Sequence, residues 1–180
     1  MAQLEGILLA EGFTGLTMDE LAARTNCSKS TLYSIAGTKE QLVIAVTKRF
    51  FGRAAEEIEA AVAAEDDARQ RIATYLTGVG TAMRRQSPDF YIDMVGFRPT
   101  AEIYQRNSST AARRVGEMID DGVRQGVFRP VDGTFAAQLI ALAIDGVQSG
   151  ELLRTTGLSA GDAFAELGDL LLNGLSSQRP

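Results

Sequence analysis

The chain has 180 residues, 45% of them apolar and 23% charged, which is enough for one or two domains with a sizeable buried core. It contains no His and a single Cys, which excludes His-based catalytic triads, most catalytic zinc sites and an internal disulfide. The net charge of −5 argues against a protein that coats nucleic acid over its whole surface. Because no apolar run could span a membrane and the start lacks a signal-peptide pattern, we expect a soluble, cytoplasmic, non-enzymatic protein without metal or cofactor.

The charge is distributed unevenly along the chain. Residues 1–53 carry six basic and five acidic side chains, a balance of +1, whereas the remaining residues carry 12 basic and 18 acidic ones, a balance of −6. The three Lys residues of the chain, Lys29, Lys39 and Lys48, all lie in the first part. A nucleic-acid-binding surface is therefore expected in the N-terminal third or not at all.

The first predicted element is a short helix near the N-terminus. Leu4, Ile7 and Leu8 recur at the spacing of one helix face. Gly12 follows this run and suits a helix C-cap in the left-handed region, which glycine adopts without steric cost. Pro is scarce and the rest of the chain also has helical periodicity, so we predict an all-α protein.

Three further helix starts are predicted within a stretch of 22 residues, from position 17 to position 38. Thr17 and Glu20 have the spacing of a capping box, in which the hydroxyl accepts from the third helical amide and the carboxylate reaches back. Ser28 is a favourable N-cap, and Thr38 with Gln41 has the spacing of a second capping box. Helices are therefore expected to begin near residues 17, 28 and 38.

The first two of these helices form a predicted helix-turn-helix. The helix from Thr17 can extend only to about Thr25, because Asn26 tolerates the left-handed conformation of a tight turn and the next helix starts at Ser28. Its expected small core consists of Leu21, Ala22, Cys27, Leu32 and Ile35. Its expected outward face on the second helix consists of Lys29, Ser30, Thr31, Tyr33 and Ser34.

Such an outward face suits contact with DNA. Ser and Thr hydroxyls reach base edges or phosphates, Lys reaches guanine acceptors or phosphate, and the second helix of such a unit enters the major groove. The spacing alone fits equally well an ordinary helical hairpin with a polar surface. A helical enzyme that uses paired carboxylates is a further alternative, but the sequence contains no constellation that supports it.

The segment contains a series of residues with a characteristic order and spacing: Gly12-Phe13, Thr17, Leu21-Ala22, Cys27-Ser28, Leu32-Tyr33, Lys39-Glu40 and Leu42. In these residues it resembles the DNA-binding domain of the TetR family of transcriptional regulators. The resemblance implies a three-helix DNA-binding domain over residues 1–46. It also implies a larger helical domain for effector binding and dimerisation over residues 47–180, joined by a continuous helix and giving about nine helices in all.

The resemblance also implies roles for individual residues. Thr17 and Lys39 would bind backbone phosphates, residues 28–31 would face the bases, and Tyr33 would place its hydroxyl on a phosphate. The predicted DNA-binding residues are Thr17, Ser28, Lys29, Ser30, Thr31, Tyr33, Ser34, Thr38 and Lys39. The partner would be a palindromic double-stranded operator, bound by a homodimeric repressor that a small, largely apolar effector releases and that has no membrane association. The alternative is a helical interaction or ligand-binding module with weak or lost DNA binding.

The C-terminal part contains the candidates for effector binding and dimerisation. Aromatic and Met side chains supply an apolar pocket wall, although ordinary core packing explains them as well. The pocket candidates are Tyr75, Met83, Phe90, Tyr91, Met94, Phe97, Tyr104 and Met118. Helices near 134–153 and 159–175 are apolar around most of their circumference, which fits a central core helix or a dimer interface. The residues predicted to lie within this dimer interface or directly behind it are Leu139, Leu142, Ile144, Val147, Leu167 and Leu171. The charged pair Arg113-Arg114 is expected on a solvated helix face.

Overall fold

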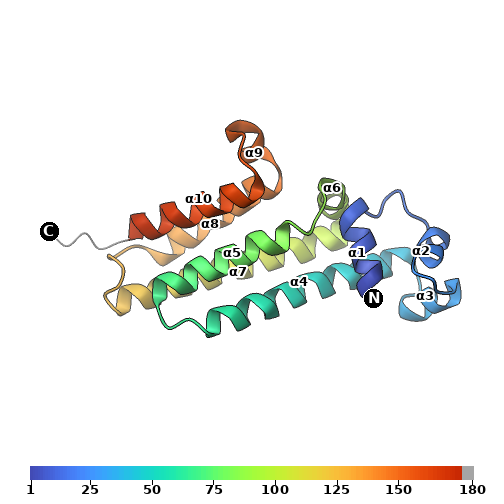
Figure 1. Ribbon diagram of the computed structural model, residues 1–180, viewed down its shortest axis with the longest axis horizontal. Coiled ribbons are helices and arrows are strands. Elements are labelled where there is room, and N and C mark those ends of the chain that lie inside the picture. Colours follow the sequence, from blue (N-terminus) through green and yellow to red (C-terminus); the bar gives the residue numbers. More distant parts are fainter. Residues whose placement is uncertain (176–180) are drawn as a thin grey trace. The chain divides into compact units, whose positions relative to one another are not determined.

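The computed structural model describes residues 1–175, apart from the side chains of residues 160 and 161. All regular elements in this range are helices, which confirms the all-α prediction (Figure 1). There are ten of them between residues 1 and 175, against about nine expected: α1 (Ala2–Glu11), α2 (Met18–Arg24), α3 (Lys29–Ile35), α4 (Lys39–Ala63), α5 (Ala68–Met83), α6 (Pro88–Gly96), α7 (Arg98–Arg124), α8 (Gly133–Gln148), α9 (Glu151–Thr156) and α10 (Ala160–Leu175). No helix in the described range is long and apolar enough to cross a bilayer.

The three predicted helix starts are confirmed by the caps of α2, α3 and α4. The Thr17 hydroxyl accepts from the Glu20 amide at 3.2 Å, and the Glu20 carboxylate accepts from the Thr17 amide at 2.8 Å, so the predicted capping box is complete. The Ser28 hydroxyl accepts from the Thr31 amide at 3.1 Å. Asn26 has a φ of 50° and makes the tight turn between α2 and α3.

Two local predictions differ from the structure in detail. Thr38 caps α4 by accepting from the Gln41 amide at 3.2 Å, but the Gln41 side chain accepts from Gly37 at 2.9 Å instead of from Thr38. The second capping box is therefore only half formed. Gly12 has the expected positive φ of 76°, but its ψ of −166° lies outside the left-handed helical region.

The small core between α2 and α3 is formed by most of its predicted members. Leu21 and Leu32 are buried, Ala22 lies beside them and Cys27 is half-buried, but Ile35 is 43% exposed. Helix α3 ends at Ile35, and Ala36 is four residues beyond Leu32 and so shares its face. Ala36 is buried in the extended conformation that follows the helix, which leaves Ile35 on the outside.

The chain divides into two compact units. The first, here called the head unit, contains residues 1–53 and 85–106; the second, the body unit, contains residues 54–84 and the described chain from 107 onward. The head unit therefore extends beyond the predicted boundary at residue 46 and includes α6 and the start of α7. The reason is that α6 packs on α1, where the Ser87 amide donates to the Leu9 carbonyl at 2.8 Å.

The body unit is a helical bundle around a continuous apolar core. Helix α5 lies along α10, and α8 contacts both α9 and α10 (Figure 1). Ile72 of α5, Ile119 of α7 and Ile140 of α8 are fully buried in this core. The predicted helix over 134–153 is interrupted, because Ser149 ends α8 and Gly150, with a φ of 74°, begins the short α9.

We expect two apolar side chains of α8 to differ sharply in their contribution to stability. Ile140 is fully buried and Leu142 is 70% exposed. Ile140→Ala should lower the free energy of unfolding by about 2–5 kcal/mol through lost burial and a residual cavity, whereas Leu142→Ala should change that of the monomer by less than about 0.5 kcal/mol. Urea denaturation at dilute protein concentration measures both values, and equal losses would contradict the assignment of the two faces.

Candidate nucleic-acid interface

Helix α3 presents a polar face to solvent, as predicted. Leu32 is buried, whereas Tyr33 is 45% exposed. The other exposed residues of this face are Lys29, Ser30, Thr31 and Ser34. An exposed face of hydroxyl groups, one phenol and one ammonium can donate to and accept from base edges in a major groove.

The hydroxyl groups of this face are bonded to one another. Ser28 Oγ lies 2.7 Å from Ser30 Oγ and 2.8 Å from Thr31 Oγ1, and it also accepts from the Thr31 amide. Ser34 Oγ donates to the Thr31 carbonyl at 2.7 Å. Ser28 and Ser34 are thus engaged mainly within α3, while Ser30 and Thr31 are oriented at its exposed first turn.

Thr17 is also engaged within the protein. Its amide and its hydroxyl both donate to Glu20 Oε2, each at 2.8 Å. These bonds, first that from the amide and then that from the hydroxyl, hold the pKa of Glu20 below its ordinary value. A phosphate could take the Thr17 donors only if the Glu20 carboxylate moved away.

Lys29 forms an ion pair across the helix-turn-helix. Its Nζ lies 2.7 Å from Oδ1 and 2.9 Å from Oδ2 of Asp19, which belongs to the first turn of α2. The hydrogen bond to Asp19 raises the pKa of Lys29. Arg24 forms a similar forked pair with Glu11.

Lys39 contacts the turn between α1 and α2. Its Nζ donates to the Thr14 carbonyl at 3.2 Å, which places the ammonium group on this turn. The neighbouring cap residue Thr38 is exposed. Lys39 is therefore half-buried and held on this turn, and its contact with a phosphate stays a prediction.

The turn that Lys39 contacts is fastened by Asp93 of α6, a residue that sequence reasoning missed. Asp93 Oδ2 accepts from the amides of Phe13 and Thr14 at 2.6 and 2.7 Å, and Oδ1 accepts from the Thr14 hydroxyl at 2.6 Å. Burial alone would raise the pKa of Asp93, but these hydrogen bonds and Lys39 together outweigh it and leave the pKa below its ordinary value. Asp93 interrupts an apolar segment between Phe90 and Phe97, and this was the only local signal.

Five of the eight predicted pocket residues lie in the head unit: Phe90, Tyr91, Met94, Phe97 and Tyr104. Phe90 and Phe97 each pack edge-on against Phe13, with centroids 6.0 and 6.3 Å apart, and Tyr91 packs against Tyr104 at 5.9 Å. Phe90 is completely buried. In this structure these rings therefore contribute to the core of the head unit.

The other three pocket candidates, Tyr75, Met83 and Met118, lie in the body unit. Tyr75 is buried, and burial together with the nearby Glu59 carboxylate raises its pKa to about 12, although Arg114 acts in the opposite direction. The Tyr75 hydroxyl is thus protonated at neutral pH and available as a hydrogen-bond donor beside a pair of charged groups.

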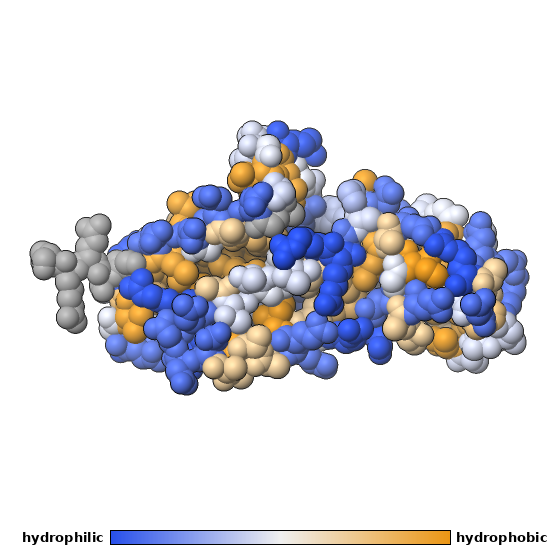
Figure 2. Space-filling model, viewed as in Figure 1, coloured by the Kyte–Doolittle hydropathy of each residue, from blue (hydrophilic) through white to orange (hydrophobic). Residues whose placement is uncertain are grey.

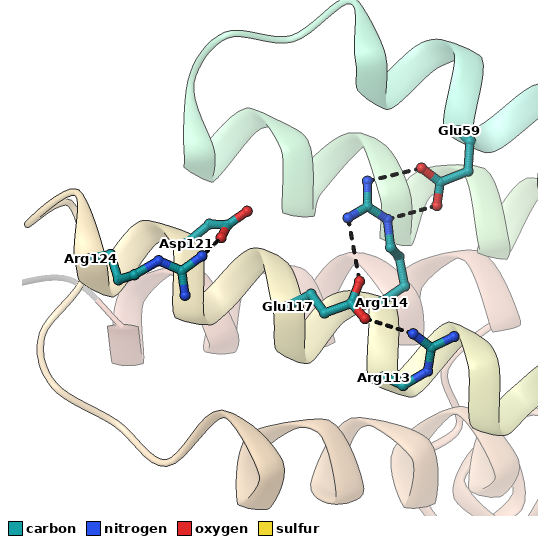
Figure 3. Close-up of polar contacts among 6 residues, drawn as sticks. All are labelled: Glu59, Arg113, Arg114, Glu117, Asp121 and Arg124. Carbon is teal, nitrogen blue, oxygen red and sulfur yellow. Dashed lines mark hydrogen bonds and ion pairs between the residues drawn. The ribbon is translucent and has the colours of Figure 1, made fainter.

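That charged pair joins α4 to α7. Arg114 Nε and Nη2 donate to the two carboxylate oxygens of Glu59 at 2.9 and 3.0 Å (Figure 3). Glu117 lies between the two neighbouring guanidinium groups, 2.7 Å from Arg113 and 3.7 Å from Arg114. Only 34% of the Arg114 side chain is exposed, so the prediction of a solvated face was wrong for Arg114. Its partner lies 55 residues away in the sequence, and helix periodicity cannot reveal such a contact.

The predicted interface residues divide between a surface and the core behind it. Leu139 and Leu142 are 53% and 70% exposed. Phe135 of α8 and Leu170 of α10 are also exposed, and Figure 2 shows hydrophobic residues at the surface along α10. In contrast, the remaining four are buried or half-buried in the body core: Ile144, Val147, Leu167 and Leu171.

Residues 7–46, which contain the helix-turn-helix and its caps, match the profile of the bacterial regulatory proteins of the tetR family. This segment is therefore similar to the DNA-binding domain of the TetR family. A comparison with curated protein sequences finds no match. The all-α fold, with a helix-turn-helix followed by a larger helical part, is that of solved TetR-family transcriptional regulators.

Solved structures of transcriptional regulators match nearly the whole chain at low sequence identity. A transcriptional regulator from Saccharomonospora viridis, solved in complex with choline, superposes with a TM-score of 0.80 at 17% identity over 98% of this chain and 95% of that one. A TetR-family regulator from Cytophaga hutchinsonii gives 0.74 at 18% identity over 99% and 93%. The fatty acid degradation regulator FadR from Bacillus halodurans gives 0.73 at 14% identity over 99% and 93%.

The body unit has an open groove between α7 and α8, with a volume of about 540 Å³. Small residues allow the two helices to approach closely, since a Cβ on Gly116 would lie 3.1 Å from that of Ala137. Arg113, Glu117 and Gln138 supply polar groups along the groove. None of the eight predicted pocket residues lines it.

We expect the turn held by Asp93 to require glycine at position 12. A Cβ there would lie 2.5 Å from Asp93 Oδ2 at a positive φ, whereas nothing lies within 4 Å of a Cβ at Gly15. Gly12→Ala should cost at least about 1–3 kcal/mol of unfolding free energy, and Gly15→Ala should be close to neutral. Thermal unfolding followed by circular dichroism compares the two, and a neutral Gly12→Ala would contradict the geometry.

Proposed function

We propose that this chain is a homodimeric transcriptional repressor that binds a palindromic operator and is released by a small-molecule effector. The observation that carries the proposal is the exposed polar face of α3, held on capped short helices within the segment that matches the TetR family. The second helix of a helix-turn-helix lies in the major groove with its N-terminal residues towards the bases. In this chain the first turn of α3 carries Lys29, Ser30 and Thr31.

The candidate DNA-binding residues fall into three roles under this proposal. Lys29, Ser30 and Thr31 would contact base edges, because they are exposed on the first turn of α3. Contacts to backbone phosphates are assigned to Thr17, Tyr33, Thr38 and Lys39. Ser28 and Ser34 would act mainly by holding the first and last turns of α3, since both are bonded within the helix.

Dimerisation would use the exposed apolar residues of the body unit. Phe135, Leu139 and Leu142 of α8 and Leu170 of α10 are each more than half exposed, which is unfavourable unless a second copy covers them. A two-fold axis at this surface would present two copies of α3 to two half-sites. Those half-sites would lie about one helical turn, roughly 34 Å, apart on one face of the duplex.

The effector would act by preferring a state in which the two copies of α3 no longer fit the operator. The pocket candidates of the body unit, Tyr75, Met83 and Met118, are an aromatic residue and two Met, which favours a largely apolar molecule. The related regulator from Saccharomonospora viridis binds choline, which supports a small-molecule ligand for this chain too. Helix α6 carries the pocket candidates Phe90 and Met94 as well as Asp93, so a shift of α6 would also move the turn at residues 12–14.

The first test is a gel shift with duplexes from the native upstream region, together with the Lys39→Ala variant. The wild type should retard one duplex specifically at moderate salt. Lys39→Ala should weaken binding to all sequences alike and reduce the slope of log K against log salt by about 0.9, because one phosphate contact is lost.

Lys48→Ala provides the matched control, because Lys48 is an exposed lysine of the same helix, two and a half turns further along. Its salt slope should equal that of the wild type. Absence of any specific retardation by the wild type would reject the repressor in favour of an interaction module without DNA binding. An unchanged slope in Lys39→Ala would reject the phosphate contact alone.

Dimerisation is tested by placing a charge on the exposed apolar face. Leu142→Asp should convert the dimer to a monomer in sedimentation analysis, because an interface would have to bury an unpaired carboxylate. Specific operator affinity should then fall by at least tenfold, because the two heads no longer bind together. Ile92→Asp introduces the same charge at a position of α6 that is 62% exposed, and it should remain dimeric. A dimeric Leu142→Asp variant would disprove this interface.

A further inference from the structure

The head unit pairs its basic side chains with carboxylates of its own. Within residues 1–53, ion pairs join Arg24 to Glu11, Lys29 to Asp19, and both Arg49 and Arg53 to Glu5. A surface in which most cations have a neighbouring anion exerts little attraction on distant phosphates. With a net charge of only +1 over residues 1–53, the head therefore offers little attraction to DNA of arbitrary sequence.

The pair between Lys29 and Asp19 differs from the others because it lies at the reading surface. Lys29 is the first residue of α3, and Asp19 is in the first turn of α2. Their side chains are 48% and 73% exposed. Both carboxylate oxygens are within 2.9 Å of the ammonium nitrogen, so the carboxylate faces the position that a DNA acceptor would take beside Lys29.

We propose that Asp19 is a specificity-determining residue of this protein, which competes with DNA phosphates for Lys29. The inference rests on the proposed DNA binding by α3. A phosphate that approaches Lys29 must either displace Asp19 or lie beside its negative charge, and both are unfavourable whatever the base sequence. Asp19 therefore lowers the affinity for DNA in general.

A base edge meets a smaller penalty than a phosphate does. Guanine N7 and O6 are neutral acceptors, and an ammonium group has three donors. Lys29 can donate to such an acceptor while it stays close to Asp19, without bringing a second negative charge near the carboxylate. Asp19 should consequently weaken binding to random DNA more than binding to an operator that offers a base acceptor to Lys29.

The test is a double-mutant cycle with Asp19→Asn and Lys29→Ala, measured by fluorescence anisotropy on a random duplex and on the retarded upstream duplex over a range of salt. Asp19→Asn should bind the random duplex several-fold more tightly at low salt, with a salt slope steeper by about 0.9. The gain on the upstream duplex should be smaller, so the ratio of the two affinities should fall. In the Lys29→Ala background, Asp19→Asn should have almost no effect.

Two controls separate this effect from general charge and from folding. Asp169→Asn removes the same charge from an exposed site on α10 and should leave both affinities unchanged. Asp19→Ser is a second neutral variant that should reproduce Asp19→Asn. Unchanged binding to the random duplex in both Asp19 variants, or an equal gain in the Lys29→Ala background, would overturn the inference. A wild type that binds all duplexes alike would instead overturn the proposed function, while the cycle on the random duplex would still report on Asp19.

Discussion

The arrangement of the head unit depends on one carboxylate that holds a turn 80 residues away in the sequence. Asp93 accepts three hydrogen bonds from Phe13 and Thr14, and Gly12 allows the close approach. The Thr14 carbonyl of the same turn accepts a hydrogen bond from Lys39 at the start of α4. The turn is therefore connected to α6 and to α4, which together fix where α2 begins.

This connection matters because α2 and α3 are too short to be stable as isolated helices. Helices α2 and α3 have seven residues each, well below the length at which an isolated helix is stable in water. Their caps at Thr17 and Ser28 satisfy the first amides, and Leu21 and Leu32 provide the small core between them. The rest of their stability must come from the surrounding helices, so a displacement of α6 would be transmitted to the surface that carries Lys29.

Most of the local structure could be predicted from the sequence, since caps and tight turns depend on neighbouring residues. Thr17 with Glu20, Ser28 and Asn26 all behave as their spacing indicates. The contacts of Asp93 and Arg114 could not be predicted, because their partners are 79 or 80 and 55 residues distant. The outward position of Ile35 depends on where α3 ends. If a helix ends one residue earlier or later, a neighbouring side chain takes the buried position, as Ala36 does here.

The internal pairing of charges links these local features to the acidity of the whole chain. The residues beyond position 53 carry a balance of −6 and would repel DNA, while the head neutralises most of its own cations. Long-range attraction is thus weak, and under the proposed function affinity would come from short-range contacts by α3 and from simultaneous binding of two heads. Short-range contacts depend on base sequence and simultaneous binding depends on half-site spacing, so a protein of this charge pattern trades non-specific affinity for discrimination.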